Sequence, residues 1–265
     1  MKTGFIGGGK MGEAIISNLI SSHTVKPQDI YVSDKESERR RIMRQRYCVN
    51  VFSDNRAIPE SVDVLVLAVK PQDLDKALDT LGDSIGEKHL VLSIAAGKRL
   101  SYLKSRLPES GIVRVMPNIA ALVSQSMTVF TADESIGDTD RRKVEKLLSS
   151  FGRVLELPEA QFDAVTALSG SGPAFFGYFL QAMIEGGMSL GLTEKDSAVL
   201  AKQTILGTAT LLVEKSISAG ELIEAVSSPG GTTVAGLGVL EEEPLKEIVR
   251  RALSVTAVRS QELSN

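Results

Sequence analysis

The sequence predicts an α/β fold in two parts: a doubly wound parallel sheet, followed by an all-α domain that pairs with another copy. Three observations predict it. Short apolar runs alternate with helical stretches over the first half of the chain, and a glycine-rich turn follows the first run. After Pro158 the apolar runs give way to long helical patterns rich in Ala, Leu and Gly. At about 150 residues per domain, the 265 residues suit two domains, which we expect at 1–158 and 159–265.

The first domain is expected to hold six core strands, because its apolar runs are almost continuous, as in parallel strands buried on both faces. Helical stretches at 11–21 and 36–46 follow the first two runs. Two later runs, at 127–131 and 154–157, are expected to add edge strands. The six core runs lie at 2–6, 30–32, 49–51, 62–67, 90–94 and 112–115.

The second domain is expected to be helical, with Thr193 and Ser218 as N-caps and Gly191 as a helix end. Its helices are apolar on more than one face, as at Leu200 and Leu206. A small helical domain cannot bury all of that surface internally, so we expect a homo-oligomer, at least a dimer, formed through these helices. The expected helices lie at 173–190, 194–215, 219–226, 234–240 and 245–263.

Composition excludes several classes of function. The 30 basic and 33 acidic residues give a net charge of −3, so there is no bulk positive field to hold nucleic acid or an anionic membrane. The single cysteine, Cys48, excludes an internal disulfide and a multi-cysteine zinc site, and no metal is expected. The uncharged run 164–184 is broken by Gly172-Pro173, so it indicates core helix rather than a membrane span. We therefore expect a reduced, cytoplasmic protein.

The strongest local signal is the turn at 7–12, which reads GGGKMG and lies between the first strand and the first helix. This is the G-x-G-x-x-G pattern of Rossmann dinucleotide-binding domains. Gly7 permits the tight turn, Gly9 lets backbone approach a pyrophosphate, and Gly12 lets the helix pack against the strand. The pattern predicts dinucleotide binding, with the pyrophosphate at the helix N-terminus.

The end of the second strand carries conflicting signals about the cofactor's ribose. Asp34 lies roughly 20 residues after Gly12, near the spacing at which an acidic residue accepts a hydrogen bond from the ribose 2′-hydroxyl of NAD. Lys35 and Arg39 lie within reach of a 2′-phosphate, which favours NADP. The basic run 39–41 can equally be a solvated helix face. We expect NADPH, with NADH as the alternative.

Two further turns follow the carboxyl ends of predicted strands, where an open α/β sheet binds its ligand. The first is 68–71 (AVKP) and the second is 95–97 (AAG). Small residues in the second turn suit close approach of a ligand to backbone, although a generic turn uses them too. Lys70 can equally be a surface lysine, and Pro71 can simply start a helix.

The second domain contains a polar, glycine-rich loop, 227–233 (SSPGGTT), ahead of an apolar helix. One interpretation is structural: a loop whose Ser or Thr caps the helix. The other is functional: glycines expose backbone N–H groups at a helix N-terminus, which can bind a small carboxylate beside two hydroxyl groups.

Neither His23 nor His89 has an evident partner for nucleophilic catalysis, whereas hydride transfer relies on the cofactor for its chemistry.

Four stretches make the sequence resemble the pyrroline-5-carboxylate reductase family, from residue 1 to residue 263. Two of them, 4–12 (GFIGGGKMG) and 68–71, are shared with other Rossmann dehydrogenases. The third is 168–174 (LSGSGPA). The fourth, 227–233 with the trailing 235–237 (AGL), matches the family's own signature and is highly specific.

The resemblance implies hydride transfer from NAD(P)H to the imine carbon of 1-pyrroline-5-carboxylate, giving L-proline in the last step of proline biosynthesis. It also implies a Rossmann domain followed by a helical domain that interlocks with a partner's. The substrate-binding residues that it implies are Val226, Ser228, Gly231, Thr232 and Thr233, and Thr233 would act catalytically by hydrogen-bonding the ring nitrogen. The cofactor-binding residues that it implies are Ile6, Gly7, Gly8, Gly9, Lys10, Met11, Asp34, Asn55, Ala68, Val69, Lys70, Pro71, Ala95, Ala96, Asn118 and Ser171.

Two departures from the family pattern concern the cofactor and the turn after the sixth strand. The family usually reads Met-Pro-Asn-Thr-Pro where this chain has MPNIA at 116–120, which removes a polar contact from Ile119. Many members carry a small uncharged residue where Asp34 stands, so an acid here weakens the preference for NADP.

Two alternatives stay open: a 3-hydroxyacid dehydrogenase, which needs a catalytic lysine such as Lys195 or Lys202, and a non-catalytic dinucleotide sensor.

Overall fold

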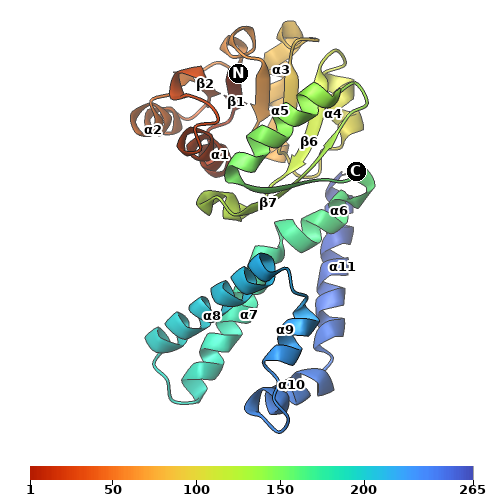
Figure 1. The fold of residues 1–265 in the computed structure, drawn as a ribbon. Helices are drawn as coiled ribbons and strands as arrows, with labels where there is room; N and C mark the ends of the chain where they lie inside the picture. The colour runs from red at the N-terminus through yellow and green to blue at the C-terminus, as the bar shows by residue number, and fades with distance from the viewer. Residues whose placement is uncertain (265) are drawn as a thin grey trace. The chain divides into compact units, whose positions relative to one another are not determined.

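The computed structural model describes residues 1–264, apart from the side chain of Asp83. It divides into two compact units, which are described separately (Figure 1). Unit 1 comprises Met1–Ser171 and the chain from Thr256 onward, and unit 2 comprises Gly172–Val255. The expected domain boundary after residue 158 lies before this division, because the segment 159–171 packs with unit 1.

Unit 1 is built on an eight-stranded sheet in the order β3-β2-β1-β4-β5-β6-β7-β8. The first six strands are parallel, β6 and β7 are antiparallel, and β7 and β8 are parallel again. The sheet is therefore mostly parallel, and the expectation that both late runs form edge strands was wrong for β7, which lies between β6 and β8. The strands are β1 Thr3–Ile6, β2 Ile30–Ser33, β3 Asn50–Phe52, β4 Val64–Leu67, β5 Leu90–Ser93, β6 Gly111–Met116, β7 Ser126–Ala132 and β8 Gly152–Glu156.

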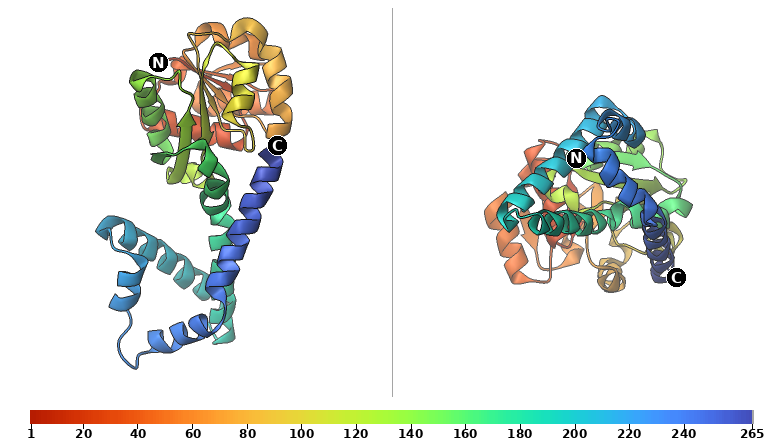
Figure 2. Two further views of the ribbon diagram at one scale, coloured as in Figure 1. Left: turned by 90° about the vertical axis from the view of Figure 1, so that its right-hand side faces the viewer. Right: turned by 90° about the horizontal axis from the view of Figure 1, so that it is seen from below.

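Helices cover both faces of the sheet (Figure 2). Successive strand residues point to opposite faces, so Phe5 belongs to one apolar core and Ile6 to the other. The first core is closed by α1 (Lys10–Ser21), α2 (Ser37–Tyr47) and α5 (Asp138–Leu148). The second core is closed by α3 (Leu74–Leu81) and α4 (Leu100–Arg106). This is the doubly wound arrangement that the apolar runs predict.

Short helices complete unit 1. After β8 the chain forms α6 (Phe162–Val165), which continues into a π-helix at Thr166–Gly170. Single 3-10 turns connect the other elements and lie at Pro27–Asp29, Asn55–Ala57, Pro59–Ser61, Pro71–Asp73, Gly82–Ser84, Ile119–Val123, Ser149–Phe151 and Glu159–Gln161.

Unit 2 is entirely helical, as expected. Thr193 caps α8 by accepting a hydrogen bond from the Asp196 amide, and Ser218 forms a capping box with Glu221 at the start of α9. Gly191, between α7 and α8, has a φ of 94°, as expected of a residue that ends a helix. The helices are α7 Gly172–Ser189, α8 Glu194–Lys215, α9 Ala219–Ala225, α10 Thr232–Glu242 and α11 Leu245–Ser264.

The helices of unit 2 bury little apolar surface among themselves. Large side chains on α7 and α8 stay exposed in the single chain: Phe176 at 64%, Tyr178 at 79% and Leu206 at 59%. An apolar surface of this extent is the kind that protein partners cover. Within residues 1–264, no helix combines the length and the apolar character needed to cross a membrane.

The last turns of α11 belong to unit 1. Ser260 is buried there, and its Oγ donates to Oδ1 of Asp163 at 2.7 Å. A Cβ on Gly97, in the turn after β5, would lie 2.9 Å from the carbonyl oxygen of Leu263. The end of α11 therefore packs directly on the turn that contains Ala95 and Ala96.

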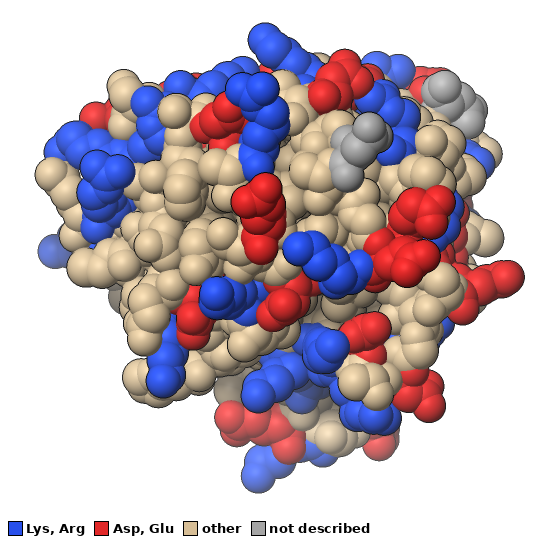
Figure 3. All heavy atoms as spheres, turned by 90° about the horizontal axis from the view of Figure 1, so that it is seen from above, with Lys and Arg blue, Asp and Glu red and all other residues tan. Residues whose placement is uncertain are grey.

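The surface of unit 1 carries both signs of charge. On the face shown in Figure 3, basic and acidic side chains are interspersed over the described residues, without a continuous basic patch. Charged side chains of unit 1 also form ion pairs, as Arg106 does with Asp75 and Asp79. This face therefore lacks the basic stripe that is typical of nucleic-acid-binding surfaces.

Candidate active site

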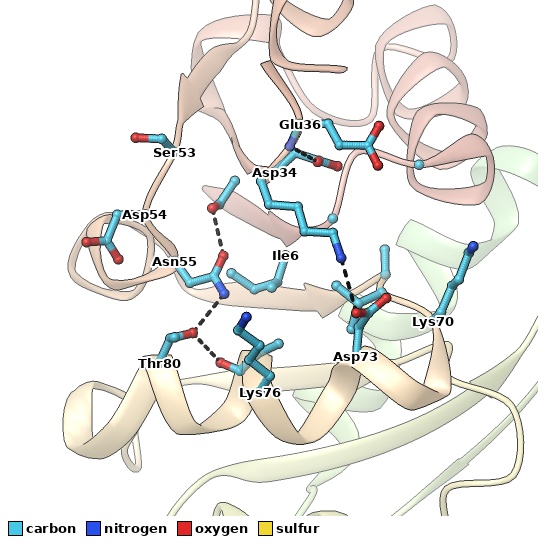
Figure 4. A pocket seen from close by; sticks show the side chains of 17 residues that line it. Ile6, Asp34, Glu36, Ser53, Asp54, Asn55, Lys70, Asp73, Lys76 and Thr80 are labelled. Carbon is cyan, nitrogen blue, oxygen red and sulfur yellow. Dashed lines mark hydrogen bonds and ion pairs between the residues drawn. The ribbon is translucent and has the colours of Figure 1, made fainter. Parts of the chain in front are cut away.

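Unit 1 holds a cavity of about 580 Å³, within the size range of small-molecule sites (Figure 4). It lies beyond the carboxyl ends of β1, β2, β3 and β4. The strand order reverses between β1 and β4, so the cavity occupies the topological switch point where open α/β sheets bind ligands. Its lining residues are Ile6, Gly7, Gly9, Ser33, Asp34, Lys35, Glu36, Ser53, Asp54, Asn55, Ala68, Val69, Lys70, Asp73, Lys76, Ala77 and Thr80.

The glycine turn has the geometry that the pattern predicts. Gly7 has a φ of 102°, and a Cβ there would lie 2.7 Å from the carbonyl oxygen of Ala68. A Cβ on Gly12 would lie 2.5 Å from the carbonyl oxygen of Gly7. Gly9, the N-cap of α1, lines the cavity, and beyond its chain neighbours no described atom lies within 4 Å of the place where its Cβ would be. Its backbone is therefore open to a ligand at the helix N-terminus.

Both backbone groups of Gly8 are bonded to side chains from the segment after β2. The Gly8 amide donates to Oδ2 of Asp34 at 2.7 Å, and the Gly8 carbonyl accepts from Nε of Arg39 at 2.7 Å. Arg39 also pairs with Glu13 on α1, with Nη2 2.5 Å from Oε2. Burial raises the pKa of Glu13, but hydrogen bonds from Arg39 and Tyr47 outweigh it, so the net pKa lies below its usual value. Glu13 is thus held as a carboxylate.

The basic run after β2 makes contacts within the protein. Arg39 is absent from the cavity lining, because its guanidinium is held by Gly8 and Glu13. Arg40 donates to the backbone carbonyls of residues 34 and 35, and Arg41 pairs with Glu38. Of Lys35 and the run 39–41, only Lys35 lines the cavity. Arg40 and Arg41 therefore stabilise α2 and its start.

Asp34 lines the cavity with a carboxylate that already has two backbone donors. Its Oδ2 accepts from the Gly8 amide and its Oδ1 accepts from the Glu36 amide at 2.8 Å. Each carboxylate oxygen has a second lone pair. Asp34 can therefore accept a further hydrogen bond from a ribose hydroxyl without giving up its hold on the glycine turn.

Asn55 joins two walls of the cavity. Its Oδ1 accepts from Oγ of Ser33 at 2.7 Å, and its Nδ2 donates to Oγ1 of Thr80 on α3 at 2.9 Å (Figure 4). Thr80 in turn donates to the carbonyl of Ala77 at 2.7 Å. These hydrogen bonds fix the side-chain amide of Asn55 at the edge of the cavity, next to the end of β2.

The cavity contains residues that sequence reasoning missed. Asp73, Lys76 and Thr80 come from the 3-10 turn after Lys70 and from α3, a helix whose range was not predicted. A signal for it existed, because Leu74, Ala77, Leu78 and Leu81 have helical spacing and all are buried. Ser33, at the end of β2, was also missed.

The structure brings only part of the predicted cofactor set together. Pro71 starts the 3-10 turn that leads into α3, as its alternative interpretation expected. Asn118 uses its side chain to accept from the Ala120 amide and to donate to Ser169. The predicted residues that line the cavity are Ile6, Gly7, Gly9, Asp34, Asn55, Ala68, Val69 and Lys70. Those outside its lining are Gly8, Lys10, Met11, Pro71, Ala95, Ala96, Asn118 and Ser171.

In unit 2, the loop 227–233 ends at the N-terminus of α10, whose first residues are Thr232 and Thr233. Gly230 has a φ of 70°, and Gly231 is the N-cap. Within the described chain no side chain caps this helix, so the interpretation of the loop as a Ser or Thr cap was wrong. The first amides of a helix lack intrahelical acceptors. The loop therefore presents amides and hydroxyl groups together.

The loop is also tightly folded. A Cβ on Gly231 would lie 2.5 Å from Oγ of Ser228 and 2.9 Å from the Ser228 carbonyl oxygen. The Gly231 amide donates to that carbonyl at 2.9 Å. Ser228 thus folds back over the start of α10, and only glycine fits at position 231.

The doubly wound sheet, the glycine turn and the cavity at the switch point define an NAD(P)-dependent oxidoreductase of the Rossmann type. The family described as "NADP oxidoreductase coenzyme F420-dependent" matches residues 2–97, which include β1 to β5. The family described as "Pyrroline-5-carboxylate reductase dimerisation" matches residues 159–263.

Relatives match the chain from end to end. A pyrroline-5-carboxylate reductase of Synechocystis is 39% identical over 99% of this chain and 98% of that protein, and one of Arabidopsis thaliana is 36% identical over 99% and 95%. The structure of a pyrroline-5-carboxylate reductase from Coxiella burnetii superposes with a TM-score of 0.95 at 34% identity, covering 100% of this chain and 98% of that one. The Plasmodium falciparum enzyme with NADP bound gives 0.89 at 27% identity, with the same coverage. The chain belongs to the pyrroline-5-carboxylate reductase family.

Proposed function

We propose that this chain reduces 1-pyrroline-5-carboxylate to L-proline with NAD(P)H, the last step of proline biosynthesis. The end-to-end similarity to pyrroline-5-carboxylate reductases carries the proposal. In this reaction the imine carbon gains a hydride and the ring nitrogen keeps a proton, so that the C=N bond becomes a C–N single bond. The cofactor supplies the hydride when bound. The protein's task is to bind and orient the two reactants.

The residues of unit 1 fit a dinucleotide. Gly7 and Gly12 pack where a side chain would collide with backbone, and the N-terminus of α1 is open at Gly9. This end of α1 would hold the pyrophosphate, since helix N-termini attract anions. Asp34, Lys35 and Asn55 would meet the adenosine ribose or its phosphate.

The loop of unit 2 would hold the substrate. The substrate's carboxylate would bind the amides of Gly231 and Thr232 at the uncapped start of α10, with Val226 and Ser228 beside them. The Thr233 hydroxyl would accept a hydrogen bond from the protonated ring nitrogen. That contact favours the protonated imine, whose carbon is the more electrophilic.

We further propose NADPH as the preferred cofactor, with NADH as the alternative, because Lys35 lines the cavity beside Asp34. A homo-oligomer formed through α7 to α11 would cover the exposed apolar side chains of unit 2. A cytoplasmic location stays a prediction that rests on the single cysteine.

The test is an assay of the purified protein with 1-pyrroline-5-carboxylate and either reduced cofactor, followed by the absorbance of the reduced nicotinamide. The proposal predicts oxidation of the cofactor together with formation of proline. Oxidation only with a 3-keto acid or a semialdehyde acid would instead indicate a 3-hydroxyacid dehydrogenase. Absence of oxidation with every substrate would favour a dinucleotide sensor.

A further inference from the structure

We propose that Asp73 tunes the choice between NADPH and NADH, because it competes with the cofactor's 2′-phosphate for Lys35. The inference rests on the proposed function, in that the cavity of unit 1 is taken as the dinucleotide site. In Rossmann folds the residues at the end of β2 usually bind the adenosine ribose. Asp73 lies outside that segment, and the inference makes it a specificity-determining residue.

Lys35 is the cation in the right place to read a 2′-phosphate. It follows β2 directly after Asp34, at the position where a Rossmann fold distinguishes the two cofactors. The arginines nearby are committed elsewhere: Arg39 to Gly8 and Glu13, and Arg40 to two backbone carbonyls. The other lysines of the lining, Lys70 and Lys76, follow β4 or lie on α3.

Lys35 already has a partner on the opposite wall of the cavity. Its Nζ lies 3.1 Å from Oδ1 of Asp73, at the end of the 3-10 turn that leads into α3. In Figure 4 a dashed line that ends at Asp73 marks this ion pair. The two residues therefore form a bridge between the walls.

The bridge is weak enough to exchange. The Lys35 side chain is 75% exposed and that of Asp73 is 38% exposed, so water screens their attraction. A phosphate with up to two negative charges is a stronger partner for an ammonium group than a single carboxylate. Binding of a 2′-phosphate would displace Asp73, and the affinity for NADPH is lowered by the free energy of the pair that is broken. A ribose 2′-hydroxyl does not displace Asp73 from Lys35, so the affinity for NADH is not lowered.

The charge of Asp73 can also act directly, without Lys35. Four carboxylates line the cavity, from Asp34, Glu36, Asp54 and Asp73, against three lysines. Removal of any of them reduces repulsion of a phosphate. The test must therefore separate competition for Lys35 from charge alone, and a double-mutant cycle does so.

The experiment is calorimetric binding of adenosine 2′,5′-bisphosphate and of 5′-AMP to the full-length enzyme, which measures the site without turnover. We expect Asp73→Asn to tighten binding of the bisphosphate about twofold to fivefold, the range of an exposed ion pair, and to leave 5′-AMP unchanged. Lys35→Gln should weaken the bisphosphate selectively. In the Lys35→Gln background, Asp73→Asn should lose most of its effect. Asp79→Asn, on the α3 helix that follows Asp73 and paired with Arg106, is the matched control and should change the affinity for neither ligand.

Two results would overturn the inference while leaving the enzyme's activity intact. One is an equal change in affinity for both ligands in Asp73→Asn. The other is a full Asp73→Asn effect in the Lys35→Gln background, which would show that Asp73 acts by charge alone. If neither these ligands nor NADP⁺ and NAD⁺ bind the unsubstituted enzyme, the cavity is not the cofactor site, and the proposed function of unit 1 fails with it.

Discussion

Arg39 stabilises the glycine turn and does not line the cavity in which the cofactor is proposed to bind. It bonds the carbonyl of Gly8 while Asp34 bonds the amide of the same residue, so the middle of the glycine turn is held on both sides. A turn that is held before the ligand arrives loses less conformational freedom on binding. Arg39 is therefore expected to support the binding of either cofactor equally.

We predict that Arg39→Gln weakens NADP⁺ and NAD⁺ by similar factors of about tenfold, the scale of one charge-assisted hydrogen bond. Fluorescence titration of both dinucleotides measures it. Arg41→Gln, whose wild-type side chain pairs with Glu38 on the exposed face of α2, is the control and should change neither affinity. If only the affinity for NADP⁺ falls, Arg39 binds the 2′-phosphate, and its proposed role of stabilising the glycine turn through Gly8 is contradicted.

Thr233 is the residue expected to act on the substrate's ring nitrogen. Removal of its hydroxyl in Thr233→Ala should lower kcat/KM by more than about tenfold, or about 1.4 kcal/mol of transition-state stabilisation. Thr233→Ser keeps the hydroxyl and should retain most of the activity. Steady-state kinetics of the pair decides the point: normal turnover by the alanine variant would remove Thr233 from the activation of the imine.

Elements differ in how well the sequence predicts them. The strands of unit 1 were predictable because each contains a short apolar run, and α8 was predicted at its observed limits, with Thr193 as its N-cap. By contrast, α3 and α4 have only eight and seven residues, so the helical spacing of their apolar residues extends over only about two turns. With the 3-10 turn before it, α3 supplies the cavity wall that includes Asp73 and Thr80, so missing the range of α3 meant missing that wall.

Local sequence patterns do not predict contacts between residues that are distant in the sequence. The interior place of β7 depends on pairing with β6 and β8, and no feature of its own residues reports this. The fate of Arg39 likewise depends on Glu13, which is distant in sequence. The glycines of the turn, in contrast, were predictable because each is required by backbone geometry within a few residues.

In the loop before α10, Gly231 packs closely against Ser228. Gly231→Ala would place a methyl group 2.5 Å from Oγ of Ser228 and force the loop away from the helix start. We expect the KM for 1-pyrroline-5-carboxylate to rise by about tenfold or more, while the KM for the reduced cofactor changes little. Gly236→Ala, within α10 and with no atom within 4 Å of its added Cβ, is the matched control. Equal kinetics of the two variants would contradict the role of the loop in substrate binding.

For the whole molecule, the exposed apolar side chains of unit 2 predict that the single chain is not the stable species. Leu206→Glu places a charge on a 59%-exposed apolar position of α8 and should dissociate the oligomer, because an interface cannot bury an unpaired carboxylate cheaply. Light scattering after size-exclusion chromatography measures the mass. Lys195→Glu, at the charged start of α8, should leave the mass unchanged. A monomeric unsubstituted protein would contradict the predicted assembly.

The most direct test of the whole account follows the transferred hydrogen. The enzyme is incubated with 1-pyrroline-5-carboxylate and reduced cofactor carrying deuterium at both C4 positions, and the product is examined by mass spectrometry and NMR. The account predicts L-proline with a single deuterium at C5, in amounts equal to the cofactor oxidised. Proline without deuterium, or cofactor oxidation without proline, would contradict it.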